Sequence, residues 1–200
     1  MKLISILLAV GTACLAASEA SARSPIYSVP GLVGAYDTNL RRGSPPANIP
    51  AFTGKMLWFA SIGDETRGAR FSISSLDPTP IPNEHIAAMP ENALNQLIDK
   101  LTGTVTGTLS QSGLMLSGRL EPFRLTTRDK VNVIGYSAKL VRSDTGASEF
   151  PANYCRTALV FNRANTVSIT GCWDQTYIDY GVSEFHSILD SLHLVNWDDN

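Results

Sequence analysis

The clearest pattern of apolar and polar residues in the chain predicts a β-hairpin. Residues 154–161 and 166–173 are two runs rich in β-branched and aromatic residues, and the polar segment 162–165 separates them. A four-residue loop is favoured, because Arg163-Ala164 lacks the glycine or Asn-Gly that the positive φ angles of a two-residue turn favour. We therefore expect two antiparallel strands joined by residues 162–165.

The register of this hairpin follows from the length of its loop. If Phe161 pairs with Thr166, then Cys155 faces Cys172 directly across the two strands. Directly opposed residues have Cα atoms about 4.5–5.5 Å apart, which is within the range of a disulfide. The same register gathers one apolar face, the better candidate for burial: Tyr154, Ala158, Val160, Val167, Ile169 and Trp173.

A helix is predicted to follow the hairpin. Its apolar residues recur at steps of three and four: Ile178, Val182, Phe185, Ile188, Leu189, Leu192 and Val195. Thr176 and Asp179 match a loose N-terminal capping pattern. Gly181 costs about 1 kcal/mol inside a helix relative to alanine, which favours a regular helix that begins only beyond it. In either case the apolar stripe needs a sheet, and the apolar face of the hairpin supplies one.

The first half of the chain predicts a second hairpin and one helix. Residues 55–62 are almost continuously apolar, and residues 69–74 alternate between apolar and polar. Pro90 suits the first position of a helix, and Gly103 offers a left-handed stop. Between them an apolar stripe lies at helical spacing: Ala93, Leu94, Leu97, Ile98 and Leu101.

Three further strands are predicted after this helix. Apolar residues alternate with polar ones at 105–109, at 114–121 and along 131–142. The connection before the last strand holds a basic cluster, interpreted as a solvated loop with an anion site as the alternative: Arg124, Arg128 and Lys130.

These elements predict an α+β domain. We expect a mostly antiparallel sheet of about six or seven strands, with two helices packed on one face of it and one disulfide as a staple. The expected order is two strands, a helix, about five strands and a final helix.

The start of the chain has the pattern of a secretory signal peptide. Lys2 precedes an apolar run, small residues end at Ala22, and cleavage is expected after Ala22. The run is shorter than the roughly 20 residues of a membrane-spanning helix, so a retained anchor is the weaker interpretation, and lipidation at Cys14 is a second alternative. The expected division is a signal peptide at 1–22, an extended Pro/Gly-rich arm at 23–53, a single α+β domain at 54–196 and an acidic tail at 197–200.

Charge and cysteine content narrow the classes of function. Without residues 1–22 the chain keeps 15 of its 16 basic and 17 of its 18 acidic residues, and it has no basic run. This balance argues against nucleic acid as a partner and against a polybasic membrane contact. Export to the periplasm or the medium would let the two remaining cysteines form a disulfide, with two buried, reduced cysteines as the alternative.

The element order and the segment Glu184-Phe185-His186-Ser187-Ile188-Leu189-Asp190-Ser191-Leu192 resemble the Mog1/PsbP-like superfamily. The resemblance covers roughly residues 54–196, whereas the arm and the Cys155/Cys172 pair have no counterpart that we can match. It implies an accessory factor that acts by binding, with no catalytic residues to carry over. A helix-grip lipid-binding domain is the architectural alternative, and the early hairpin before a single helix favours the first interpretation.

Sequence motifs of catalysis are absent. The chain has no Gly-x-Ser-x-Gly, His-Glu-x-x-His, phosphate loop or Cys-x-x-Cys, so no cofactor is expected and no catalytic residue is assigned. His186, Asp190 and His193 share one face of the predicted helix and are a candidate surface site for a divalent metal. A solvated pair of Asp190 with a histidine is the alternative. Ser187 cannot complete a triad with His186 and Asp190, because neighbouring helical residues point in different directions.

Aromatic residues provide a candidate binding patch. Trp173, Tyr177 and Tyr180 gather where the hairpin meets the helix, an arrangement found at recognition surfaces and at pocket mouths. The edge of a hydrophobic core is the alternative interpretation.

Together these features favour an exported, non-catalytic binding or accessory protein. Its expected partner is an unidentified protein or a small apolar ligand, with no nucleic acid and no stable membrane anchor once the signal is removed. Two alternatives stay open: a carrier of a small apolar ligand between the sheet and the C-terminal helix, and a hydrolase whose site the sequence conceals.

Overall fold

A computed structural model of the chain gives the fold. It describes residues 24–26, 36–38, 40, 43–44, 55–63, 67–76, 81–111, 113–142, 154–161, 166–192 and 194. The predicted signal peptide, the acidic tail, most of the arm and the hairpin loop lie outside the described residues. Of the helices that the structure describes, none is long and apolar enough to cross a bilayer.

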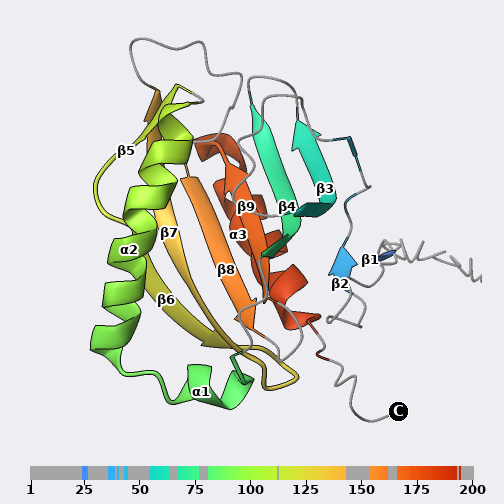
Figure 1. Cartoon of the computed structure of the whole chain (residues 1–200). Helices are drawn as coiled ribbons and strands as arrows, with labels where there is room; N and C mark the ends of the chain where they lie inside the picture. Colours follow the sequence, from blue (N-terminus) through green and yellow to red (C-terminus); the bar gives the residue numbers. More distant parts are fainter. Residues whose placement is uncertain are drawn as a thin grey trace, which may run out of the picture.

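An antiparallel sheet of seven strands is the central layer of the described part of the chain (Figure 1). Its strands are β3 (Lys55–Gly63), β4 (Gly68–Leu76), β5 (Leu114–Leu116), β6 (Glu121–Thr126), β7 (Asn132–Arg142), β8 (Tyr154–Phe161) and β9 (Thr166–Trp173). The order across the sheet is β3-β4-β9-β8-β7, and β5 and β6 pair with successive stretches of the outer edge of β7. The short strands β1 (Ser24–Ile26) and β2 (Tyr36–Thr38) form a separate pair.

Helices lie on both faces of the sheet. Helices α1 (Asn83–Ala87) and α2 (Glu91–Ser110) cover the face that Figure 1 views, while α3 (Ile178–Asp190) packs on the opposite face, after the short 3-10 helix η1 (Gln175–Tyr177). The expectation that both long helices share one face was wrong. Strand β8 carries apolar side chains on both faces, so each long helix packs on a core of its own. The α2 side of β9 carries Cys172 beside the buried hydroxyl residues Thr166, Ser168 and Thr170. The α+β class, the antiparallel sheet and the number of strands are confirmed.

The face of the sheet that contacts α3 is the apolar face predicted for the hairpin. Buried side chains from β4, β8, β9 and α3 form one cluster here: Phe71, Ile73, Ala158, Val160, Val167, Ile169, Trp173, Phe185, Ile188, Leu189 and Leu192. Tyr154 is half-buried and packs against the same cluster. The predicted partnership between the hairpin and the following helix is therefore confirmed.

The opposite face forms a second core under α1 and α2. Its buried members come from both helices and from β5, β7, β8 and β9, with Leu120 beside them: Ile86, Leu94, Ile98, Val105, Leu109, Leu114, Leu120, Ile134, Tyr136, Ala138, Leu140, Cys155, Leu159, Phe161 and Cys172. The disulfide therefore lies on the α2 side of the sheet, away from α3.

Helix α2 is longer than the sequence indicated. It continues through Gly103 to Ser110, so the predicted stop at Gly103 and the predicted strand at 105–109 were both wrong. Val105 and Leu109 satisfy an alternation with threonine, but they also continue the helical spacing from Ile98, and burial against the sheet decides for the helix. A Cβ at Gly103 would meet nothing within 4 Å, so this glycine lies on the open side of the helix.

The single strand predicted at 114–121 is two strands. Leu114–Leu116 is β5 and Glu121–Thr126 is β6, and the chain turns between them at Gly118, whose φ of 107° suits glycine. Arg124 was assigned to a connection, but it lies within β6 and pairs with Ile134 of β7. The strand predicted along 131–142 is confirmed as β7.

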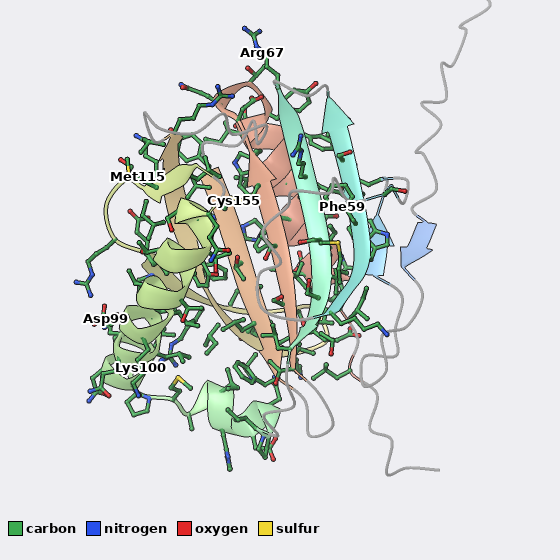
Figure 2. The ribbon with its side chains drawn as sticks, turned by 45° about the horizontal axis from the view of Figure 1, so that its top comes forward. Phe59, Arg67, Asp99, Lys100, Met115 and Cys155 are labelled. Carbon is green, nitrogen blue, oxygen red and sulfur yellow. A yellow bond between two sulfur atoms is a disulfide. The ribbon has the colours of Figure 1, made fainter. Side chains whose placement is uncertain are left out.

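The predicted register of the β8–β9 hairpin is confirmed at every described pair. Phe161 pairs with Thr166, Cys155 pairs with Cys172, and the two cysteines form a disulfide with Cα atoms 4.1 Å apart. Figure 2 shows Cys155 in the middle layer of the molecule.

Candidate functional site

A small group of polar and aromatic side chains lies on the α3 side of β7 and β8, where the sheet extends beyond the helix. In the β7–β8 register Ser137 is paired with Arg156 and Lys139 is paired with Tyr154. Paired residues of adjacent strands point to the same face, so these four side chains form a compact square. His186 of α3 borders it. We call these five residues the β7–β8 patch.

Arg156 is the central cation of the patch. Its guanidinium Nη1 lies 3.0 Å from Nε2 of His186, and Arg156 itself is half-buried. A guanidinium can only donate hydrogen bonds, so Nε2 of His186 accepts and its ring is in the neutral form with the proton on Nδ1. The histidine thus holds the Arg156 side chain against the sheet without neutralising its charge.

The environment of His186 favours the neutral ring. Partial burial lowers the pKa of His186, and the adjacent Arg156 charge lowers it further, while Asp190 one turn along α3 raises it. The two lowering effects exceed the raising one, so the net pKa lies below the usual histidine value. His186 therefore accepts the hydrogen bond from Arg156 at neutral pH.

Lys139 and Tyr154 form the other half of the patch. The Lys139 ammonium lies 5.9 Å from the centroid of the Tyr154 ring, within cation–π range. Lys139 is exposed and Tyr154 is half-buried against the α3 core. The Tyr154 ring is therefore held by the α3-side core and lies on the same face of the sheet as the cations Lys139 and Arg156.

The predicted metal site is only partly within the described residues. His186 and Asp190 are both exposed on α3, whereas His193 lies outside the residues that the structure describes. Within those residues no three His, Cys, Asp or Glu side chains gather in a group that could hold a metal ion. A metal at His186, Asp190 and His193 stays a prediction.

The predicted aromatic patch is divided between core and surface. Trp173 is only 1% exposed, and its indole packs against Phe185 and Phe71 with ring centroids 6.3 and 6.4 Å apart. Its indole nitrogen is buried and has no hydrogen-bond partner among the residues that the structure describes. Tyr177 and Tyr180 are half-buried at the edge of the same core, so only these two could present a surface to a partner.

Asp174 fixes the junction between β9 and α3. One carboxylate oxygen accepts hydrogen bonds from the backbone N–H groups of Thr176 and Tyr177, at 2.6 and 3.1 Å, and caps η1. The other oxygen accepts from the N–H of Gly68 at 2.6 Å, and the backbone N–H of Asp174 donates to the Gly68 carbonyl. The cap is therefore Asp174, and the suggested capping pair of Thr176 and Asp179 was wrong.

Gly181 is required for the close approach of α3 to the sheet. The helix begins at Ile178 and includes Gly181, so the expectation that it begins beyond this glycine was wrong. A Cβ at Gly181 would lie 2.6 Å from Cε3 and Cγ of Trp173, closer than van der Waals contact allows. Gly181 lowers the local helix propensity, but its lack of a side chain allows α3 to pack closely on the indole ring of Trp173.

We expect Gly181→Ala to destabilise the protein by about 1–2 kcal/mol, because overpacking against Trp173 outweighs the gain of about 1 kcal/mol in helix propensity. The matched control is Gly103→Ala, where a Cβ meets nothing within 4 Å and the same propensity gain should stabilise the protein. Urea unfolding of both variants measures the difference. Stabilisation by Gly181→Ala equal to that of Gly103→Ala would contradict the packing argument.

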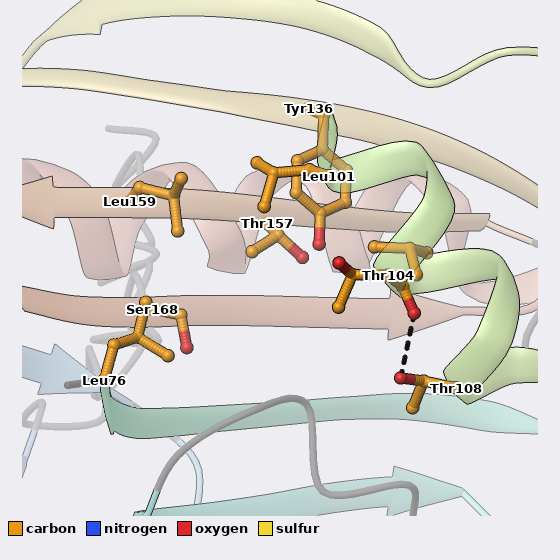
Figure 3. Close-up of a pocket in the computed structure, with 9 residues that line it drawn as sticks. Leu76, Leu101, Thr104, Thr108, Tyr136, Thr157, Leu159 and Ser168 are labelled. Carbon is orange, nitrogen blue, oxygen red and sulfur yellow. Dashed lines mark hydrogen bonds between the residues drawn. The ribbon is translucent and has the colours of Figure 1, made fainter. Parts of the chain in front are cut away.

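A small cavity lies between α2 and the sheet (Figure 3). Its volume is about 60 Å³, and its wall combines hydroxyl-bearing and aliphatic side chains: Leu76, Leu101, Thr104, Val105, Thr108, Tyr136, Thr157, Leu159 and Ser168. Burial raises the pKa of the Tyr136 phenol, a hydrogen bond with Thr157 lowers it, and the burial effect is the larger. Thr157 also lies 3.1 Å from the hydroxyl of Thr170. The cavity therefore has neutral polar groups, and none of the described residues that line it is charged.

The β7–β8 patch was not predicted from the sequence, because it combines side chains of two strands and a helix that no sequence motif links. Arg156 and Tyr154 are two positions apart on one strand and must share a face. The confirmed hairpin register places Tyr154 on the α3 side. Arg156 lies on the same side, because alternate residues of a strand share a face. Lys139 could not be added from sequence, because the pairing of β7 with β8 is not encoded by a short turn.

Comparisons with known proteins inform the fold. No protein-family model matches the chain, and no curated protein matches it either. The chain is similar to the solution structure of cyanobacterial PsbP (CyanoP) from Synechocystis sp. PCC 6803, with a TM-score of 0.54 and 11% sequence identity. The alignment covers 96% of this chain and 99% of that chain. At this identity the likeness supports a PsbP-like fold.

Proposed function

We propose that this protein, which has a PsbP-like fold, is an exported, non-catalytic accessory protein that acts by binding a protein partner. Three features support the proposal: the likeness to CyanoP, the disulfide between Cys155 and Cys172, and the signal pattern of residues 1–22. A disulfide persists in oxidising compartments such as the periplasm or the medium.

The observation that carries the proposal is the β7–β8 patch. Arg and Tyr are among the residue types that contribute most to binding energy at protein interfaces, and Arg156 and Tyr154 lie side by side on a rigid sheet. The sheet fixes their positions before a partner arrives, which reduces the entropy lost on binding. Such a surface suits recognition of another protein.

The carrier alternative has one structural feature in its favour, the cavity under α2. Its volume of about 60 Å³ is well below the roughly 300–1,000 Å³ of most ligand pockets. The interface of the sheet with α3, where the sequence suggested a ligand, is filled by side chains such as Phe185 and Leu189, which are 0% exposed. The structure therefore gives more support to a binding surface than to a carrier.

Native mass spectrometry of protein purified from the producing cells tests the function. We expect a complex with a second polypeptide at fixed stoichiometry, which must also form again from the two purified components. The mass of the chain should correspond to cleavage after Ala22 with the disulfide intact. A monomer that carries a stoichiometric small molecule and no polypeptide would contradict the proposal in favour of a carrier.

A further inference from the structure

We propose that the β7–β8 patch docks a carboxylate side chain of the partner, held by the Arg156 guanidinium and assisted by Lys139. This inference rests on the proposed function, because it names the chemistry of the partner at that site. The expected segment carries an isolated Asp or Glu with basic residues on either side.

Arg156 has unused capacity to donate hydrogen bonds. A guanidinium carries five N–H donors, and the contact with Nε2 of His186 engages Nη1 only. The partner of Arg156 is a neutral ring, and among the residues that the structure describes no carboxylate forms a direct ion pair with its guanidinium. A carboxylate matches the planar fork of the remaining donors and would add both charge and two parallel hydrogen bonds.

The surroundings of Arg156 favour a carboxylate that belongs to a protein. Tyr154, which is half-buried, lies two positions from Arg156 on the same face of β8, and aromatic rings of this kind anchor apolar parts of a partner. Lys139, held over the same ring, adds a second cation at the rim. The patch therefore offers one charged anchor with an apolar neighbour, and not an extended basic track.

Two carboxylates flank the patch and restrict its ligands. Glu121 of β6 is paired with Ser137 and so points to the same face, and Asp190 lies one turn beyond His186 on α3. Both are exposed. They would repel a polyanion such as nucleic acid or an anionic membrane, but they would attract basic residues on either side of one docked carboxylate. This complementarity selects a segment of alternating charge.

The direct test uses a defined peptide probe. The capped peptide Lys-Ala-Asp-Ala-Lys is titrated into the full chain, and the matched peptide Lys-Ala-Asn-Ala-Lys serves as the control without the carboxylate. Backbone amide shifts in NMR spectra report the position and the affinity. We expect shifts centred on Ser137, Lys139, Tyr154 and Arg156 with the Asp peptide, and at least fivefold weaker binding of the Asn peptide.

Variants separate this site from general electrostatic attraction. Arg156→Gln should weaken the Asp peptide about fivefold or more, and Lys139→Gln about twofold, because the rim charge is solvated. Arg128→Gln and Lys100→Gln remove the same charges elsewhere; Arg128 is exposed in the β6–β7 turn, and Lys100 is exposed on α2 (Figure 2). Neither control should change the affinity. Thermal unfolding confirms that Arg156→Gln is folded.

The outcomes distinguish this inference from the proposed function. If the native complex forms with Arg156→Gln as tightly as with the unmodified chain, the partner docks elsewhere and the inference is overturned while the function stands. Equal binding of the Asp and Asn peptides, or equal losses in the Arg128→Gln control, also overturns it. Inorganic phosphate that competes more strongly than the Asp peptide would identify a phosphate site instead, which the proposal excludes.

Discussion

Replacing Asp174 by alanine is expected to lower the free energy of unfolding by about 3 kcal/mol. The substitution removes acceptors from three backbone N–H groups, those of Gly68, Thr176 and Tyr177. Hydrogen bonds to a charged group contribute roughly 1.5–3 kcal/mol each, and water replaces part of that loss where the donors are accessible. The Gly68 donor bond is buried, so its loss carries most of the cost.

Two further variants sharpen this prediction. Asp174→Asn keeps one carbonyl oxygen but presents an NH₂ group to one of the donors, so its stability should lie between those of the unmodified protein and Asp174→Ala. Asp99→Ala removes an exposed carboxylate whose partner is Arg119, and it should change stability by no more than about 0.5 kcal/mol. Urea unfolding ranks the three. A loss for Asp174→Ala no larger than that for Asp99→Ala would refute the role of this cap.

Removing the disulfide in the double variant Cys155→Ala/Cys172→Ala is expected to destabilise the protein by about 3 kcal/mol. The bond closes a loop between cysteines 17 positions apart, and a loop of this length restricts the unfolded chain by roughly that amount in the chain-entropy description. The two side chains are buried under α2, so their truncation adds a smaller packing loss.

Reductant distinguishes the covalent bond from the packing. The unmodified protein should lose most of the 3 kcal/mol when it is unfolded in urea with dithiothreitol, whereas the double variant should give the same midpoint with and without the reductant. If reduction leaves the unmodified protein unchanged while the double variant is destabilised, packing and not the covalent bond stabilises the hairpin.

The β8–β9 hairpin could be predicted from sequence because the residues that determine it are close together in the chain. The four-residue loop fixes the register, the alternation fixes the face, and the cysteine pair checks both. The stripe of α3 was recognisable for the same reason, since steps of three and four have no other periodic interpretation. Asp174 was not recognised as the cap because its third donor, Gly68, lies in a distant hairpin.

The predictions of the fold that were wrong concern segments whose apolar pattern fits both a helix and a strand, or strands that are apolar on both faces. Val105 and Leu109 agree with a strand and with a helix, and only the core under α2 decides between them. The placement of the helices on opposite faces depends on β8, where Val160 contacts the α3 core and Leu159 contacts the α2 core. When a strand has apolar residues on both faces, its sequence does not show which helix covers which face.

The candidate site was less accessible to sequence reasoning than the fold. The position of Arg156 on the α3 side follows from the alternation of side chains along β8. Its contact with His186 could not be predicted, because the distance between β8 and α3 depends on how the helix packs on the sheet. For Trp173 the sequence offered two interpretations, a buried position on the apolar face of the hairpin and a surface patch, and the structure supports burial, because the absence of a Cβ at Gly181 lets α3 pack on the indole.

The pairing of β4 with β9 has a consequence for the order of folding. Among the described strands the β3–β4 hairpin joins the rest of the sheet only through β9, and Gly68 bonds to Asp174 across 106 positions of sequence. A chain emerging from the ribosome cannot complete this sheet until β9 has been synthesised, and such distant pairings form slowly. If the chain is exported as proposed, this delay would leave time for a transport apparatus to take it up before the sheet is complete.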